Sequence, residues 1–289
     1  RIISDPSIIF KDSVMIKNKN LFNDKFLLRK LLPSLCENRS NFHKSCQKIA
    51  NEIFWENIDV HSDSEMNYVK ILYNAEIYEL DQKVGKLVDV LISEGLLDRT
   101  ILVITSDHGE EFMEHGRTEH GTTLYDEVTR VPLIVRIPGI GRKEISSLTQ
   151  GIDIMPTILD LIDIAIPRQV QGISLLPLIR GDVESLNEYV YAETFGDLSS
   201  VRSDNWKYIT NFSPLGGVKE LYNLKRDPSE KRNLVTIEPE IEKHMRDQLK
   251  RHFGGITMSR IYSERINVET RGHIKRWIAV AGERLMEYF

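Results

Sequence analysis

The sequence contains few cysteines, no long apolar run and no excess of one charge, and each absence excludes a class of protein. Only Cys36 and Cys46 occur among its 289 residues. They form no CxxC pair and are too few for a disulfide framework, so we expect free or structural thiols. No apolar stretch approaches the roughly 20 residues that cross a bilayer, so we expect no transmembrane segment in this chain. The formal charge of -5, with no long block of one sign, gives no reason to expect nucleic acid as a partner.

What the chain does contain is sufficient for a folded core. Hydrophobic residues make up 41% and charged residues 28% of the sequence, which suits one sizeable globular core with a smaller appendage. The chain starts at Arg1 rather than at a methionine, so we expect it to be the later part of a longer protein, in which a signal peptide could precede Arg1. The sequence assigns neither a compartment nor an oligomeric state.

Apolar periodicity divides the chain into four stretches. Residues 1–65 are rich in lysine and asparagine and predict a connecting segment of irregular structure and short helices. Residues 66–184 predict an α/β domain. Residues 185–255 contain short strand-like runs and turn residues, which predict a small antiparallel sheet, with a helix from about Glu238. Residues 256–289 predict a helical tail.

The second stretch alternates between helical and strand patterns. Apolar residues recur at intervals of three and four over residues 66–94, which predicts a helix lying on a core. The runs at residues 100–105 and 131–139, "TILVIT" and "VPLIVRIPG", are typical of strands buried on both faces of a parallel sheet. Residues 153–163 predict a helix with Asp153 as its N-terminal cap. This order of elements favours a three-layer α/β domain.

Three of the eight histidines lie in "TSDHGEEFMEHGRTEHG", residues 105–121, directly after the first predicted strand. Asp107 and His108 stand where that strand ends, and ligands of open parallel sheets bind beyond the carboxyl ends of the strands. A carboxylate oxygen beside an imidazole nitrogen suits a divalent cation of the Mg, Mn, Ca or Zn kind. The alternative is that Asp107 caps a following helix and that His108 packs within a loop.

His115 and His120 follow in the same loop, and each precedes a glycine. Either imidazole could hydrogen-bond a charged oxyanion or carry a proton near neutral pH, although each one taken alone is more readily explained as structural. The neighbouring acids Glu110, Glu111 and Glu114 are interpreted as first-turn residues of a helix, where the helix dipole favours negative charge.

In this order the motifs resemble the later half of the sulfatase family, within the alkaline phosphatase superfamily. The resemblance covers about residues 66–235 and is carried by "LLDRTILVITSDHGEEFMEHGRTEHGTTLYDEVTRVPLIVRIPG", "GIDIMPTILDLIDI" and "ELYNLKRDPSEKRNLV". It implies a three-layer α/β/α sandwich of alkaline phosphatase/sulfatase type with a small C-terminal antiparallel sheet and helix. It also implies a metal-dependent hydrolase of sulfate esters, that is, a sulfuric ester hydrolase.

The resemblance further implies roles for single residues. Asp107 and His108 stand at the family's later pair of metal ligands, so one divalent ion is expected. Many sulfatases have asparagine at the position of His108, so Mn or Zn joins Ca or Mg as a candidate. His120 falls where many relatives carry a lysine that binds the sulfate oxygens, and His115 matches a histidine often found near the site. Both are therefore predicted to be catalytic residues.

The family's nucleophile is missing from this sequence. Its Cys/Ser-x-Pro-x-Arg motif, in which the cysteine or serine is converted to formylglycine, does not occur here. We therefore expect formylglycine upstream of Arg1 and an inactive isolated chain. The expected substrate is a small-molecule or glycan ester of sulfate or phosphate. A phosphonate or phosphodiester hydrolase and a non-catalytic sulfatase-like binding protein are the alternatives.

Overall fold

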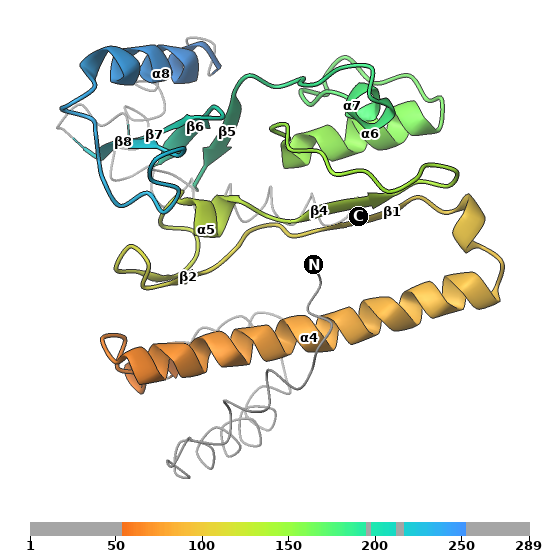
Figure 1. Ribbon diagram of the computed structural model, residues 1–289, viewed down its shortest axis with the longest axis horizontal. Coiled ribbons are helices and arrows are strands. Elements are labelled where there is room, and N and C mark those ends of the chain that lie inside the picture. The colour runs from red at the N-terminus through yellow and green to blue at the C-terminus, as the bar shows by residue number, and fades with distance from the viewer. Residues whose placement is uncertain (1–53, 195–197, 212–216, 253–289) are drawn as a thin grey trace, which may run out of the picture. The chain divides into compact units, whose positions relative to one another are not determined.

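The computed structural model describes residues 54–194, 198–211 and 217–252 (Figure 1). The predictions for residues 1–53, for the two cysteines and for the helical tail lie outside the described residues. The chain divides into two compact units, which we call the first unit, Arg1–Ile101 with Glu111–Glu119, and the second unit, Leu102–Glu110 with His120–Phe289. No helix of the described ranges is long and apolar enough to span a membrane.

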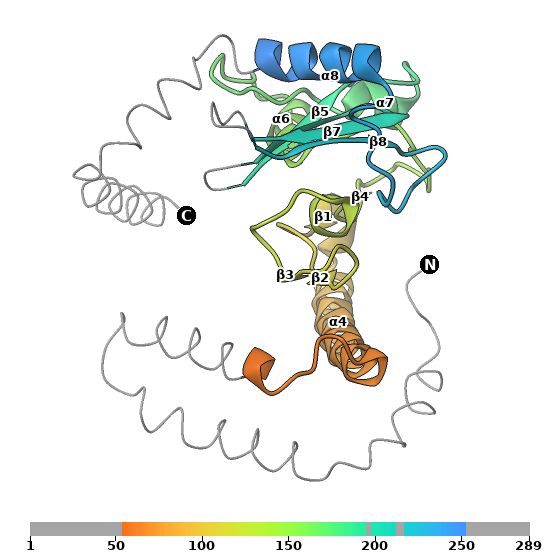
Figure 2. The same ribbon diagram turned by 90° about the vertical axis from the view of Figure 1, so that its left-hand side faces the viewer.

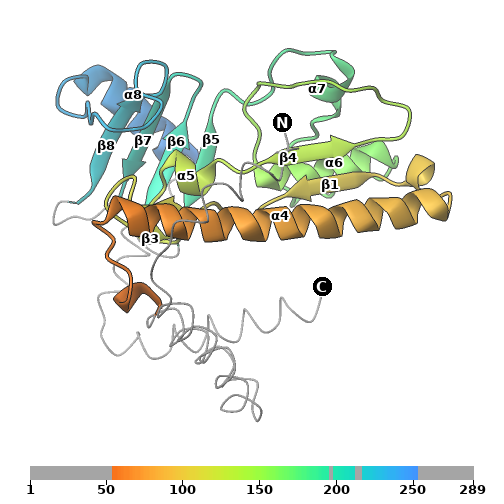
Figure 3. The same cartoon turned by 60° about the horizontal axis from the view of Figure 1, so that its bottom comes forward.

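The first unit is dominated by the long helix α4, Asp63–Ser93, which confirms a helix over residues 66–94 (Figure 3). Only Met66 and Val69 of this helix are buried, whereas Leu80 and Leu87 are exposed, so most of the predicted apolar stripe does not lie on a core in the described residues. The helix ends because Gly95 takes a left-handed conformation, with φ of 64°. In that conformation the Gly95 and Leu96 amides donate to the carbonyls of Ile92 and Leu91, at 3.0 and 2.8 Å. These bonds satisfy two of the carbonyls that a helix end leaves unpaired. The short 3₁₀ turn η2, Leu97–Arg99, follows.

A two-residue hairpin completes the described part of the first unit. Strands β2, Glu111–Phe112, and β3, Thr118–Glu119, pair antiparallel. Phe112 packs on the small core formed by Ile58, Met66 and Val69. The helix interpretation of the acids at positions 110–114 is therefore wrong, because the chain there is extended and then turns sharply at Met113, whose φ is 69°.

The second unit begins with the strand pair β1, Leu102–Thr105, and β4, Leu133–Arg136. The two strands are antiparallel, with Val103 opposite Val135, so the prediction of a parallel pair is wrong. A parallel pair needs a crossover that returns the chain to the starting end of the sheet. The segment between these strands contains only two short strands and one short helix, and β4 runs back alongside β1.

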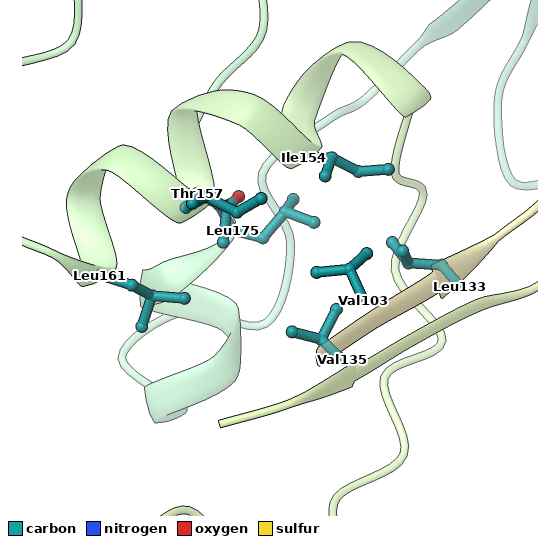
Figure 4. Close-up of a pocket in the computed structure, with 8 residues that line it drawn as sticks. Val103, Leu133, Val135, Ile154, Thr157, Leu161 and Leu175 are labelled. Carbon is teal, nitrogen blue, oxygen red and sulfur yellow. The ribbon is translucent and has the colours of Figure 1, made fainter. Parts of the chain in front are cut away.

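Helices cover one face of this strand pair. The 3₁₀ turn η3 and helices α6 and α7 span Gly151–Asp153, Ile154–Leu161 and Leu176–Arg180. A small cavity lies between α6 and the strands (Figure 4), and its lining is Thr157 with seven apolar side chains, Val103, Leu133, Val135, Ile154, Ile158, Leu161 and Leu175. Ile134 alternates to the other face and is 46% exposed, so the expected burial of both faces is also wrong.

Asp153 stands at the N-cap position of α6, as predicted, but its side chain does not cap that helix. The carboxylate is fully buried. It accepts hydrogen bonds from the Gln150 and Ile173 amides, at 2.9 and 3.0 Å, and from the Asn187 side chain at 3.1 Å. Asp153 therefore joins η3 to the following segments, which explains how a carboxylate is accommodated in the interior.

The C-terminal sheet has four antiparallel strands in the order β5-β6-β7-β8, with bounds Val190–Glu193, Ser199–Arg202, Trp206–Thr210 and Lys219–Asn223. Helix α8, Pro239–His252, lies along one face of the sheet (Figure 2). Tyr208 and Leu221 of the sheet pack against Met245 and Leu249 of the helix in a fully enclosed core. The predicted small antiparallel sheet and helix are confirmed.

Candidate metal and oxyanion site

The loop after β1 carries the first two predicted site residues, and its backbone is fixed by local hydrogen bonds. The Ser106 hydroxyl donates to the His108 carbonyl at 2.7 Å. The Gly109 amide donates to the carbonyl of Val128 at 2.8 Å. Asp107 and His108 therefore lie directly beyond the carboxyl end of β1, as the sequence predicts.

His108, Glu110 and His120 come together in the second unit and form what we call the histidine cluster. The two imidazole rings stack with 3.6 Å between centroids, and the Nδ1 atom of His120 lies 2.8 Å from Oε1 of Glu110. Each of the three residues offers one ligand atom, and these atoms lie within 4.8 Å of one another. Two imidazoles and a carboxylate are a donor set that suits a divalent transition metal.

Asp107 is oriented differently from the cluster beside it. Its side chain is 85% exposed, with Oδ2 at 3.5 Å from Nε2 of His108. The backbone amide of His108 donates to Oδ1 at 3.0 Å. This hydrogen bond, and then the charge of His108, lower the pKa of the Asp107 carboxyl below its ordinary value. No helix follows in this part of the structure, so Asp107 is not a helix cap, and its carboxylate remains open to a ligand.

Glu110 is the residue of the cluster that sequence reasoning missed. The helix-dipole argument assigned Glu110 to a helix. In the structure the chain instead leads into strand β2, and the Glu110 side chain lies beside His120 and is 26% exposed. The available signal was its spacing, because an acid two residues after His108 in a loop can reach the same ligand as that histidine. Its carboxylate also orients the His120 ring, as acidic partners of ligating histidines commonly do.

His115 lies in the first unit, on the turn between β2 and β3. The turn is closed by a hydrogen bond from the Met113 amide to the Arg117 carbonyl, at 2.8 Å. His115 is thus not one of the three residues of the histidine cluster, and its catalytic role stays a prediction.

The four-residue helix α5, Asp126–Thr129, follows the segment that carries His120 and is joined to the C-terminal sheet by ion pairs. Its first residue, Asp126, pairs with Arg202 and with Lys207. The Lys207 ammonium is 2.9 Å from an oxygen of Asp126 and also 2.9 Å from an oxygen of Glu230, and its side chain is only 1% exposed. This buried network was not predicted, because its members are far apart in the sequence.

Comparison with known proteins shows which family the residues around the histidine cluster resemble. A family model described as Sulfatase matches residues 37–164, and one described as N-sulphoglucosamine sulphohydrolase, C-terminal, matches residues 114–255. Arylsulfatase K of Gallus gallus is 33% identical over 189 residues, which are 61% of this chain and 35% of that protein. The chain thus spans about a third of the length of the curated relatives it matches.

Solved structures agree with the family matches. A 2-O GAG sulfatase is 32% identical, with a TM-score of 0.54 over 60% of this chain and 40% of that chain. The phosphonate monoester hydrolase of Agrobacterium radiobacter has a TM-score of 0.59 at 22% identity, over 65% of this chain and 42% of that chain. At that identity the second likeness shows the fold alone.

Proposed function

Because the chain belongs to the sulfatase family and has the alkaline phosphatase/sulfatase fold, we propose that it is the later part of a metal-dependent hydrolase of sulfate esters. The observation that carries this proposal is the histidine cluster with Asp107, which lies beyond the end of β1. The similar arylsulfatase K and 2-O GAG sulfatase support a sulfate ester as the substrate class. The assignment of residues 66–184 to the catalytic domain and of 185–255 to a C-terminal subdomain stays a prediction.

The donor set fits the one divalent cation that the family implies. His108 and Glu110 would hold it through one nitrogen and one oxygen, Asp107 offers a further oxygen, and His120 is left for the oxygens of the ester. The carboxylates suit Ca or Mg, whereas the imidazole favours Mn or Zn. When bound, such a cation neutralises negative charge on the oxygens of the ester.

The chain's own residues hold and orient the ester. An oxygen of Glu110 accepts a hydrogen bond from Nδ1 of His120 when that nitrogen is protonated. The second ring nitrogen, Nε2, is then directed to a ligand, and in the protonated ring it donates a hydrogen bond to a non-bridging oxygen. We therefore propose His120 as the oxyanion partner, in the place of the lysine of many relatives, and Glu110 as the residue that orients it.

The nucleophile is proposed to lie outside these 289 residues, since the Cys/Ser-x-Pro-x-Arg motif is absent from the sequence. Formylglycine upstream of Arg1 is the form that the family resemblance implies. His115 is proposed as an additional catalytic residue on the same basis. The chain alone is expected to bind the cation without hydrolysing an ester.

Cobalt binding tests the metal assignment without requiring activity. Co²⁺ titrated into the 289-residue chain should give a d–d absorption band and a heat of binding. His108→Ala should weaken Co²⁺ binding by about 10-fold or more, as loss of a metal ligand or its support typically does. His61→Ala is the matched control, because His61 lies in the first unit outside the cluster. Equal affinity of the wild-type chain and His108→Ala would contradict the assignment.

Activity in the full-length protein distinguishes the substrate classes. A chromogenic sulfate ester should be hydrolysed faster than a chromogenic phosphonate monoester, and His120→Ala should reduce that turnover by about 100-fold or more. Faster phosphonate hydrolysis would instead favour the alternative that the fold likeness to a phosphonate monoester hydrolase raises. Retention of a sulfated glycan without any turnover would favour a binding protein.

A further inference from the structure

Helix α5 contacts the loop that carries the histidine cluster at one closely packed point. The Gly109 amide donates to the Val128 carbonyl at 2.8 Å. A Cβ atom at position 109 would lie 2.0 Å from the Glu127 carbonyl oxygen. Only glycine permits this approach, so the loop position next to His108 is set by the position of the α5 backbone.

The same helix is anchored to the C-terminal sheet at its first residue. The Asp126 carboxylate accepts from Arg202 of β6 and, at 2.9 Å, from Lys207 of β7. Its backbone amide donates to the Glu230 side chain at 2.6 Å. Asp126 therefore uses both its side chain and its amide to fix the start of α5, which lies six residues after His120.

The charges in this anchor favour an ionised Asp126. Burial raises the pKa of Asp126, but the Lys207 charge and the hydrogen bonds from Arg202 and Lys207 outweigh it, so the pKa is lowered overall. For Glu230 the burial prevails over the attraction of Lys207, and its pKa is raised. Lys207 lies 2.9 Å from both carboxylates, and only Asp126 also contacts Arg202, so removing the charge of Asp126 weakens the anchor.

We propose that Asp126 is a positioning residue for the histidine cluster, because it fixes on the C-terminal sheet the helix that sets the positions of both histidine-bearing segments. The C-terminal sheet thereby sets the distance between His108 and His120 without contributing a side chain to the cluster. This inference rests on the proposed function in so far as the cluster is the cation site.

The matched control lies on the next residue of the same strand. Tyr208 of β7 follows Lys207, and its hydroxyl donates to Glu242 of α8 at 3.0 Å, in the core between sheet and helix. Tyr208→Phe removes this buried hydrogen bond and leaves Glu242 paired with Arg246. It therefore perturbs the sheet without touching the α5 anchor.

The test compares Asp126→Asn with Tyr208→Phe in the 289-residue chain. Asp126→Asn should shift the Gly109 amide resonance and the imidazole resonances of His108 and His120, and should weaken Co²⁺ binding by about 5-fold or more, since supporting residues of metal sites commonly have effects of about 10-fold or more. Tyr208→Phe should leave all of these signals at their wild-type values. If both variants change them equally, or if folded Asp126→Asn changes none, the proposal is wrong.

A milder variant keeps the test decisive if Asp126→Asn does not fold. Arg202→Gln removes one cation of the anchor and leaves the contacts of Lys207 in place, so it should shift the same three resonances by a smaller amount. Wild-type resonances in folded Arg202→Gln would then overturn the proposal. If the wild-type chain binds no Co²⁺, the proposed function loses its metal site, and the resonance shifts alone decide the role of Asp126.

Discussion

The C-terminal sheet and the β1–β4 pair are both antiparallel sheets of the second unit, but they differ in how their cores are completed. Val201, Tyr208 and Leu221 of the C-terminal sheet are fully buried, because α8 follows in the chain and covers them. No residue of β1 or β4 is fully buried, and Ile134 of β4 is 46% exposed. The candidate site is thus attached to the less enclosed of the two sheets.

The largest expected difference between these regions is in the free energy of unfolding that is lost when an apolar side chain is shortened to alanine. Leu249→Ala in α8 should lower the free energy of unfolding by about 2–5 kcal/mol, because a fully buried leucine leaves a cavity. Ile134→Ala in β4 should cost less than about 1 kcal/mol, because the side chain is 46% exposed. Urea unfolding of both variants measures the two losses, and similar losses would contradict the comparison.

A smaller loss of folding stability is expected at the contact between α5 and the loop after β1, which links the two regions. Gly109→Ala should lower the free energy of unfolding by about 1–3 kcal/mol, because its Cβ would meet the Glu127 carbonyl oxygen at 2.0 Å and the backbones must separate. Gly141→Ala is the control, since a Cβ there meets no atom within 4 Å. Thermal unfolding of the two variants tests this, and an equally small change in both would show that the loop is not held against α5.

Elements with a strong local pattern were predictable from the sequence. The apolar residues at intervals of three and four and the following Gly95 sufficed for α4, and the short apolar runs sufficed for the C-terminal strands. Asp107 and His108 were also placed correctly beyond β1, because strand ends and polar residues are both local features. The strand direction was not predictable in this way, since an apolar run such as "TILVI" has the same pattern in parallel and antiparallel pairs.

The parts of the site that were missed depend on contacts between distant residues. Asp126 and Lys207 are 81 positions apart, and no periodic pattern relates them. Glu110 was misinterpreted because the helix-dipole argument was applied to a segment that leads into the β2–β3 hairpin. His120 was singled out as a candidate from the sequence, but its stacking on His108 required the structure.

The smallest expected effect comes from an ion pair that lacks the burial of the Lys207 network. Lys70 and Glu114 of the first unit pair at 3.0 Å with side chains 44% and 34% exposed. Lys70→Met should therefore lower the free energy of unfolding by less than about 1 kcal/mol at pH 7. Urea unfolding at that pH measures the loss, and a loss as large as that of Leu249→Ala would show that exposure does not determine the strength of these contacts.

The pH dependence of this pair gives the sharper test. Burial raises the pKa of Glu114, but the hydrogen bond from the Phe112 amide and the contact with Lys70 lower it overall, below the ordinary value of 4.5. A lowered folded-state pKa means that Glu114 stabilises the fold above about pH 4.5 and that this contribution is lost as the pH falls through the folded-state pKa. In Lys70→Met the Glu114 pKa should move back towards 4.5, so the loss should begin at a higher pH. Carboxyl resonances followed by NMR titration of both proteins measure this shift, and an unchanged Glu114 titration would assign the lowered pKa to the Phe112 amide rather than to Lys70.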